Sequence, residues 1–128
     1  MNNEHELMRG EFDWFAVDHD GRVGLFATGG EGFIPHIVLD NFKEHDTVAD
    51  SMDDPRWGSP DVWSDYSKIG LYVYDWDCKN GLYNRVRTPA VEIGSELRDR
   101  ILSLNSLVKF AFAFEISPNV EKRQITGR

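Results

Sequence analysis

The residues Asp18-His19-Asp20-Gly21 place two carboxylates and an imidazole beside a glycine, a composition that could hold a cation. A calcium loop of the EF-hand type needs oxygen ligands at alternating positions over about twelve residues, closed by a glutamate. Here a β-forming segment begins already at Val23, so the spacing does not fit that loop. Because Asp-Gly is a strong hairpin signal, we predict a tight turn between two strands instead.

His36, Asp40 and Glu44 follow one another at intervals of four residues in a segment with helical periodicity, so they would share one stripe of a helix. Such a stripe could contribute metal ligands. A metal site usually draws ligands from more than one element, however, and Lys43 lies beside these acids. We interpret the stripe as a solvated face and predict no metal site. His45 falls within the apolar stripe of the same helix and is predicted to be a core or boundary histidine.

No residue has the surroundings of a catalytic nucleophile. Cys78 follows Asp77, and a neighbouring carboxylate raises the pKa of a thiol, which disfavours the reactive thiolate. The loop Gly29-Gly30-Glu31-Gly32 could approach a phosphate at a helix N-terminus, but Glu31 would repel that anion. No serine stands in a Gly-x-Ser-x-Gly elbow. We therefore predict a protein that is not an enzyme and uses no cofactor.

A hairpin rich in aromatic residues is the first candidate for a binding surface. If Asn80-Gly81 lies in the turn, Asp77 pairs with Leu82, and one face carries Tyr72, Tyr74, Trp76, Tyr83, Arg85 and Arg87. Tyrosine, tryptophan and arginine are common interface anchors, so this face could bind a protein. It could also stack on bases or on a second copy of itself. The alternative is aromatic pairing beneath a covering element.

The second candidate surface is an acidic stretch. Residues 44–66 contain seven acids and one arginine, together with three large aromatic residues. Aromatic residues among acids on a loop suit docking to a basic partner. The predicted partner-binding residues are Asp50, Asp53, Asp54, Trp57, Asp61, Trp63, Asp65 and Tyr66. The alternative is a solvated loop whose tryptophans fold back onto the core.

Bulk composition narrows the classes of partner. The chain of 128 residues suits one domain, 1–128, in which we expect 1–10 and 118–128 to be loosely ordered. Its net charge of −8 and pI of about 4.9 disfavour nucleic acid and anionic membranes and favour a basic partner. A single cysteine, no signal-peptide pattern and no long apolar run predict a cytoplasmic protein.

Periodicity predicts an α+β fold with element order β-β-α-β-β-α-β. The expected strands are 11–18, 22–28, 70–77, 82–88 and 108–116, and the two main helices are 34–51 and 96–106, with a short helical turn near 59–66. In the first strand Trp14 and Ala16 point to one face and Phe15 and Val17 to the other, so both faces should be covered. Because hairpins pair antiparallel, we expect a mostly antiparallel sheet of about five strands with both helices packed on it.

The run Phe12-Asp13-Trp14-Phe15-Ala16-Val17-Asp18-His19-Asp20-Gly21, which continues through Gly30, Gly32 and Pro35, resembles small bacterial proteins. They share an Asp-Trp-Phe-Ala-x-Asp-x-x-Gly opening and a Gly-x-Gly-x-x-Pro segment. Some of them resemble companions of polymorphic toxins, which implies an immunity role. The resemblance covers about a quarter of the chain and supplies no binding residue.

These observations predict a non-enzymatic protein-binding domain, with an immunity-type inhibitor of a basic toxin domain as its specific form. Two alternatives stay open. One is a small enzyme or ligand-binding domain that uses the Gly29–Gly32 loop or the aromatic hairpin face. The other is a homodimeric structural protein in which Tyr72, Tyr74 and Trp76 form a self-complementary face.

Overall fold

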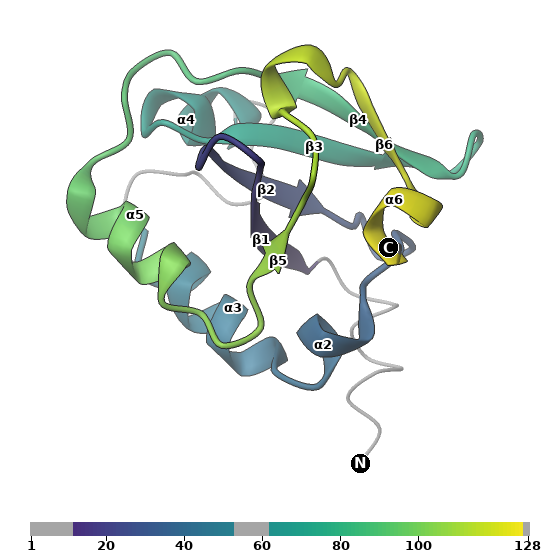
Figure 1. Cartoon of the computed structure of the whole chain (residues 1–128), viewed down its shortest axis with the longest axis horizontal. Helices are drawn as coiled ribbons and strands as arrows, with labels where there is room; N and C mark the ends of the chain where they lie inside the picture. The colour runs from purple at the N-terminus through teal and green to yellow at the C-terminus, as the bar shows by residue number, and fades with distance from the viewer. Residues whose placement is uncertain (1–11, 53–61, 127–128) are drawn as a thin grey trace.

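The computed structural model describes residues 12–52 and 62–126, which form a twisted sheet with helices around it (Figure 1). The strands are β1 (Asp13–Val17), β2 (Val23–Ala27), β3 (Tyr72–Asp77), β4 (Leu82–Arg87), β5 (Val108–Lys109) and β6 (Asn119–Glu121). The helices are α2 (His36–Leu39), α3 (Phe42–Asp50), α4 (Val62–Lys68), α5 (Ser95–Leu102) and α6 (Lys122–Thr126), with a 3-10 turn η1 (Phe114–Ile116). The α+β class predicted from the sequence is confirmed.

The described strands form one mixed sheet in the order β5-β1-β2-β3-β4-β6. The pairs β1–β2, β3–β4 and β4–β6 are antiparallel, whereas β2–β3 and β1–β5 are parallel. The prediction of a mostly antiparallel sheet of about five strands is therefore wrong. The cause lies in the connections, because the long segment between β2 and β3, which includes α2, α3 and α4, returns the chain as a parallel crossover.

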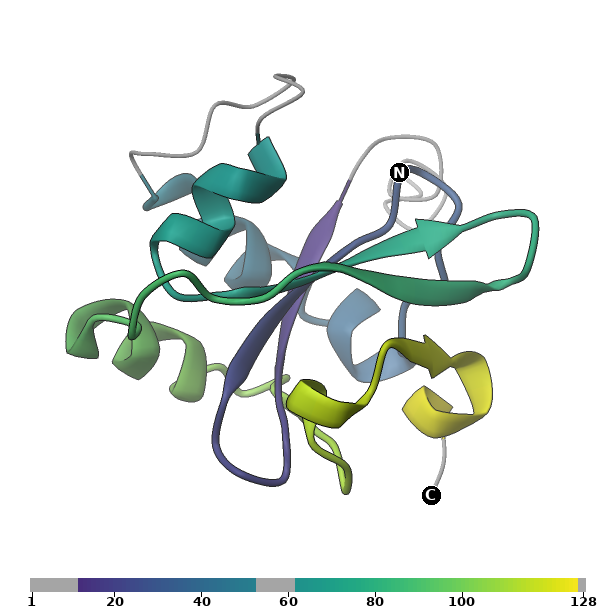
Figure 2. The same cartoon turned by 90° about the horizontal axis from the view of Figure 1, so that it is seen from above.

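Both faces of the sheet are covered, as the two-sided pattern of β1 predicts. Phe15 and Val17 belong to a cluster under α3, α4 and α5, and Trp14 and Ala16 belong to a second cluster under α2, η1 and α6. Figure 2 shows these two layers on either side of the strands. The prediction of two main helices packed on the sheet misses the second layer.

The helix predicted over 34–51 is broken into α2 and α3. Asn41 adopts a non-helical backbone with φ of −131°, and its side-chain amide donates a hydrogen bond of 2.9 Å to the carbonyl of Ile37. Asparagine side chains compete for backbone groups in this way and so favour helix ends. His36 and Glu44 consequently lie on different helices and do not share one stripe.

The prediction of a strand over 108–116 is also wrong, since only Val108 and Lys109 of this segment pair with β1. Beyond them the carboxylate of Asp18 accepts the backbone N–H of Phe114 at 2.8 Å, which draws the chain into η1. The rings of Phe110, Phe112 and Phe114 pack against one another instead of extending a ladder. Burial of the aromatic rings thus outweighs strand pairing here.

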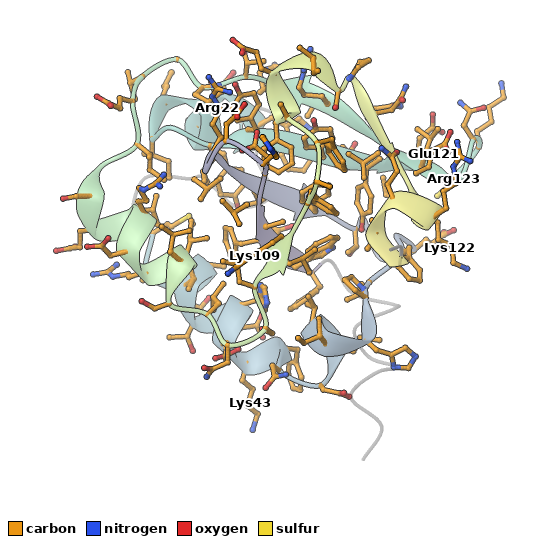
Figure 3. The ribbon with its side chains drawn as sticks, in the orientation of Figure 1. Arg22, Lys43, Lys109, Glu121, Lys122 and Arg123 are labelled. Carbon is orange, nitrogen blue, oxygen red and sulfur yellow. The ribbon has the colours of Figure 1, made fainter. Side chains whose placement is uncertain are left out.

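The segment from residue 118, predicted to be loosely ordered, forms β6 and α6 as far as it is described. Val120 is fully buried opposite Tyr83 of β4. Arg123 donates to the Glu121 carboxylate at 2.7 Å, and both residues lie where β6 passes into α6 (Figure 3). One buried valine and one added strand are enough to fix a segment whose sequence is otherwise polar.

Candidate functional site

The register of the aromatic hairpin agrees with the sequence prediction near the turn. Asp77 pairs with Leu82, Trp76 with Tyr83, and Tyr74 with Arg85. The register shifts between Val73 and Tyr74, so Arg87 lies opposite Val73 and not opposite Tyr72. A bulge of this kind moves every later side chain relative to its partner strand.

The hairpin's aromatic face is buried inside the chain. Tyr72, Tyr74 and Tyr83 are 7%, 0% and 0% exposed, and Trp76 is half-buried against Tyr83 at a centroid distance of 4.9 Å. The 110–117 segment forms the cover, since the Phe114 ring packs on Tyr74 and the Tyr74 hydroxyl donates to the carbonyl of Ser117 at 2.6 Å. This face is therefore unavailable as a docking surface or as a self-complementary dimer face.

The two arginines of the hairpin bind their own chain. Arg85 is half-buried and donates to the carbonyls of Phe114 and Glu115, which fastens η1 onto β4. Arg87 is exposed, and its Nε donates to the hydroxyl of Ser64 at 3.4 Å. Arg85 thus helps to close the cover over the tyrosines.

The Gly29–Gly32 loop is closed onto the core and offers no phosphate cradle. Thr28 accepts the backbone N–H groups of Gly30, Glu31 and Gly32, the first on Oγ1 and the other two on its carbonyl. A Cβ on Gly32 would lie 2.8 Å from the Tyr83 hydroxyl, so glycine is required for this close approach. That hydroxyl accepts from the Trp14 indole at 3.1 Å and donates to the Phe33 carbonyl at 2.7 Å. Burial raises the pKa of Tyr83, which keeps the phenol neutral.

The acidic stretch was predicted to bind a partner, but most of its predicted binding residues that the structure describes are buried or half-buried in the fold. Asp50 is exposed on α3, but Tyr66 is fully buried and Asp65 is 7% exposed. Trp63 is half-buried and packs against the cluster under α3, α4 and α5, as in the fold-back alternative. The Tyr66 hydroxyl donates to Asp13 at 3.1 Å. Asp53, Asp54, Trp57 and Asp61 lie outside the described residues.

His45 is fully buried, and both of its ring nitrogens are bonded. Nδ1 accepts the Phe15 backbone N–H at 3.1 Å, so Nε2 carries the proton and donates to the Ser106 hydroxyl at 2.8 Å. Ser106 in turn donates to Glu44 at 2.7 Å. A serine nucleophile would donate to the histidine, so this chain of hydrogen bonds runs in the non-catalytic direction. Burial lowers the pKa of His45 to about 4, against the opposing effect of the Glu44 carboxylate.

The residues Asp18 to Gly21 form the predicted turn. One carboxylate oxygen of Asp18 accepts the N–H groups of Asp20 and Arg22 at 2.9 and 2.8 Å, and the other is bonded to Phe114. Three backbone donors therefore occupy the carboxylate that a cation loop would need.

Cys78 is exposed beside Glu31 at the tip of the β3–β4 hairpin. A hydrogen bond to Glu31 raises the pKa of the Cys78 thiol, and Asp77 adds to this effect. The sequence also predicted a raised pKa for this thiol, although Glu31 contributes more to the shift than Asp77 does. The thiol therefore stays protonated at neutral pH.

A groove of about 730 Å³ runs between α3 and α5, which lie on the same side of the sheet (Figure 1). Its floor contains Val48 and Leu104, and its rim carries the carboxylates of Glu44, Glu96 and Asp99. The cation in its lining, Arg100, is paired with Glu96 at 2.9 Å. We call this feature the acidic groove.

The Glu44 carboxylate of the acidic groove stays charged at neutral pH. The Ser106 hydroxyl and the backbone N–H groups of Asn105 and Ser106 hold the pKa of Glu44 below its usual value. Elsewhere on α3, partial desolvation raises the pKa of Asp46, and the nearby Asp50 carboxylate adds to this effect. Asp50, predicted to bind a partner, is exposed on α3 but is not among the residues that line the acidic groove. The sequence analysis did not propose Glu96 and Asp99 as site residues. The pattern that could have indicated them is their position on the polar face of an amphipathic helix.

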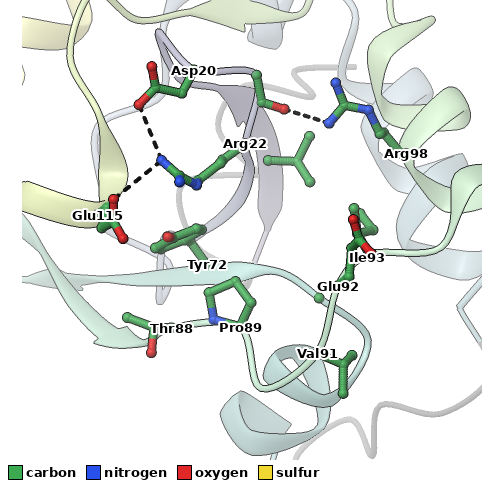
Figure 4. A pocket seen from close by; sticks show the side chains of 13 residues that line it. Asp20, Arg22, Tyr72, Thr88, Pro89, Val91, Glu92, Ile93, Arg98 and Glu115 are labelled. Atoms are coloured by element: carbon green, nitrogen blue, oxygen red, sulfur yellow. Dashed lines mark hydrogen bonds and ion pairs between the residues drawn. The ribbon is translucent and has the colours of Figure 1, made fainter.

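A second, polar pocket of about 650 Å³ lies between the β1–β2 turn, the 88–93 segment and α5 (Figure 4). Arg22 points across it and pairs with Asp20 at 3.2 Å and with Glu115 at 3.6 Å. Arg98 donates to the Gly21 carbonyl at 2.6 Å. Both guanidinium groups thus bind oxygens of the chain itself. Their contacts connect the β1–β2 turn with η1 and with α5.

Comparison with protein-family models, with curated proteins and with solved structures finds no match to this chain. Within residues 12–52 and 62–126, no helix has the length and apolar character needed to cross a membrane. In the same residues, no three or more histidine, cysteine, aspartate or glutamate side chains gather where they could hold a metal ion.

Proposed function

We propose that this chain is a non-enzymatic protein-binding domain that docks a basic protein on the acidic groove between α3 and α5. The observation that carries the proposal is the composition of the groove, in which an apolar floor lies within a rim of carboxylates. A negative rim steers a basic partner to the surface, and apolar contacts on the floor hold it there.

The apolar part of the groove gives the interface a place for an anchor residue. Val48 and Leu104 are 6% and 9% exposed, so they are fixed by the core and form a rigid floor. A partner side chain that covers this floor removes its remaining apolar area from water, at about 25 cal/mol per Å². A rigid floor loses little entropy on binding, which favours affinity.

The charged part gives the interface its specificity. Among the described residues that line the groove, Glu44, Glu96 and Asp99 face one cation, Arg100, in a chain whose net charge is −8. Carboxylates that surround an apolar floor favour lysine or arginine side chains on the partner and repel acidic surfaces. Charge complementarity of this kind raises the association rate at low salt more than it changes residence time.

An immunity-type inhibitor of a toxin domain is the specific form of this proposal. The resemblance of the run from Phe12 to Pro35 to companions of polymorphic toxins supports it. In the structure that run supplies β1, the Asp18 turn and the Thr28 loop, none of which lines the acidic groove. The resemblance thus concerns the scaffold, and the acidic groove is formed by other residues.

Charge reversal in the groove tests the proposal. We expect Glu96→Lys/Asp99→Lys to weaken binding of the natural partner about 100-fold, at roughly 1.4 kcal/mol for each reversed charge. The partner is captured from the source cell by the tagged wild-type chain and identified, and its affinity for purified wild-type and variant chains is then measured by calorimetry. If the partner is a toxin, the wild-type chain should also inhibit it stoichiometrically.

The matched control is Glu31→Lys/Glu115→Lys, which changes the net charge by the same amount at exposed positions outside the groove. This control should bind the partner within about twofold of the wild type, with allowance for long-range screening. Thermal melting verifies that both variants are folded. A partner that binds the groove variant as tightly as it binds the control would remove the acidic groove as the interface.

A further inference from the structure

The acidic groove is formed by one side of each of two helices. Its residues come in two sets, of which Glu44, Thr47, Val48 and Ser51 belong to α3 and its C-cap, and Glu96, Asp99, Arg100, Ser103 and Leu104 belong to α5 and the residues after it. Both sets contain the spacing i, i+3, i+4 and i+7, which lies along one side of a helix. Two such sides that face one another enclose a channel that follows the helices.

The helices α3 and α5 lie next to each other and run antiparallel (Figure 1). Glu44, in the first turn of α3, accepts the backbone N–H groups of Asn105 and Ser106, which follow α5, at 3.1 and 3.2 Å. At the other end, Ser51 after α3 lines one pocket together with Glu96 in the first turn of α5. Because α5 has eight residues, the channel is about 12 Å long, at 1.5 Å for each helical residue. This length matches about two turns of a partner helix.

The three carboxylates of the channel differ in how available they are to a partner. The two oxygens of Glu44 accept four hydrogen bonds from the residues that follow α5, so Glu44 supplies a fixed negative charge. Glu96 is paired with Arg100 at 2.9 Å. Among the described residues, none forms a hydrogen bond or an ion pair with the carboxylate of Asp99. Asp99 is therefore the carboxylate with which a cation of the partner can pair directly.

We propose that the acidic groove receives one amphipathic α-helix of the basic partner. This inference rests on the proposed function and adds the form of the segment that binds. Aliphatic side chains on one side of that helix cover Val48 and Leu104, and a lysine beside them pairs with Asp99.

A helix suits the channel better than an extended segment does. An extended segment needs partners for its backbone N–H and C=O groups, whereas a helix satisfies these groups internally. The walls of the channel are the sides of α3 and α5, whose backbone groups are bonded within each helix except at the ends. The channel therefore offers side chains and not a strand edge, which favours a helix that packs its own side chains between them.

A synthetic peptide with two copies of the heptad Lys-Leu-Ala-Lys-Leu-Ala-Lys serves as the probe, because it forms a basic helix with leucines on one side. Added to the full chain, it should gain helical circular dichroism and produce saturable ¹H–¹⁵N shift changes centred on α3 and α5. A matched peptide with one alanine of each heptad replaced by proline keeps the charge and the leucines but breaks the helix. It should bind at least about tenfold more weakly.

Equal affinity for the two peptides would overturn the helical form of the partner but would leave a basic partner on the groove possible. Failure of the proposed function has a different sign, which is a natural partner insensitive to Glu96→Lys/Asp99→Lys. Absence of saturable binding of the leucine peptide, or shift changes centred away from α3 and α5, would also overturn the inference.

Variants of exposed residues test the channel without disturbing the core. Asp99→Asn should weaken binding of the leucine peptide about fivefold, because it removes the direct ion pair. The matched control is Asp40→Asn, the same change at an exposed position outside the groove, which should leave the affinity unchanged. Thr47→Arg, at an exposed position in the lining, places bulk and positive charge in the channel and should weaken binding at least about tenfold. Unchanged peptide binding in Asp99→Asn or in Thr47→Arg contradicts the proposal.

Discussion

Replacing Trp14 with alanine is expected to lower the free energy of unfolding by about 3–5 kcal/mol, the usual cost of a large aromatic residue removed from a core. Trp14 is fully buried on the face of β1 that α2, η1 and α6 cover. It stacks on Phe26 at 4.5 Å and meets the edge of Tyr83 at 6.0 Å. Its indole N–H also donates to the Tyr83 hydroxyl, so the substitution removes a hydrogen bond as well as contacts.

Urea unfolding followed by far-UV circular dichroism measures this loss. Trp76→Ala is the matched control, because Trp76 also meets Tyr83 edge-on but is only half-buried. We expect that control to cost less than about 2 kcal/mol, in proportion to its smaller buried area. Equal losses in the two variants would show that the second apolar cluster is not the rigid core described above.

The second large effect is a loss of stability as the pH falls. The pKa of His45 is about 4 in the folded chain, whereas its ordinary value is 6.5. Between these values the unfolded chain binds a proton that the folded chain does not, so the free energy of unfolding decreases as the pH falls from 6.5 towards 4. At about 1.36 kcal/mol per pKa unit, the loss from His45 alone is about 3 kcal/mol. The physical cause is burial together with the Phe15 N–H, which needs the lone pair on Nδ1.

His45→Gln removes the titrating group and isolates its contribution. Its stability at neutral pH should be lower than that of the wild type, because the bonds to Phe15 and Ser106 change, but its pH dependence between 6.5 and about 4.5 should be flatter. Below that range the lowered pKa of Glu44 adds a loss of its own, since this carboxylate must be protonated. Parallel pH profiles for the two proteins would contradict the assignment of the loss to His45.

Local patterns predicted the local structure well. The alternation in β1 predicted two covered faces, and Asn80-Gly81 predicted the register of the hairpin as far as Tyr74. The Asp-Gly pair predicted the β1–β2 turn, although not that Asp18 also binds Phe114 far along the chain. Turn chemistry and side-chain alternation depend on neighbouring residues, so one sequence is enough to predict them.

Long-range pairing was not predictable in the same way. The parallel pairs of β1 with β5 and of β2 with β3 depend on how the intervening helices pack, which hydrophobic alternation does not encode. For the same reason the tyrosines of the hairpin could be interpreted as a surface, since their cover comes from the segment around Phe114. The acidic groove was missed because Glu96 and Asp99 become neighbours of Glu44 only when α5 packs beside α3.

A photo-crosslinking amino acid placed at Ser103 tests the central claim most directly, because Ser103 is exposed and lines the acidic groove. In the source cell, irradiation should join this position to a basic protein, and Glu96→Lys/Asp99→Lys should abolish the adduct. The same crosslinker at Lys79, an exposed position at the tip of the β3–β4 hairpin, should give no such adduct. An adduct at Lys79 with none at Ser103 would contradict the acidic groove as the docking surface.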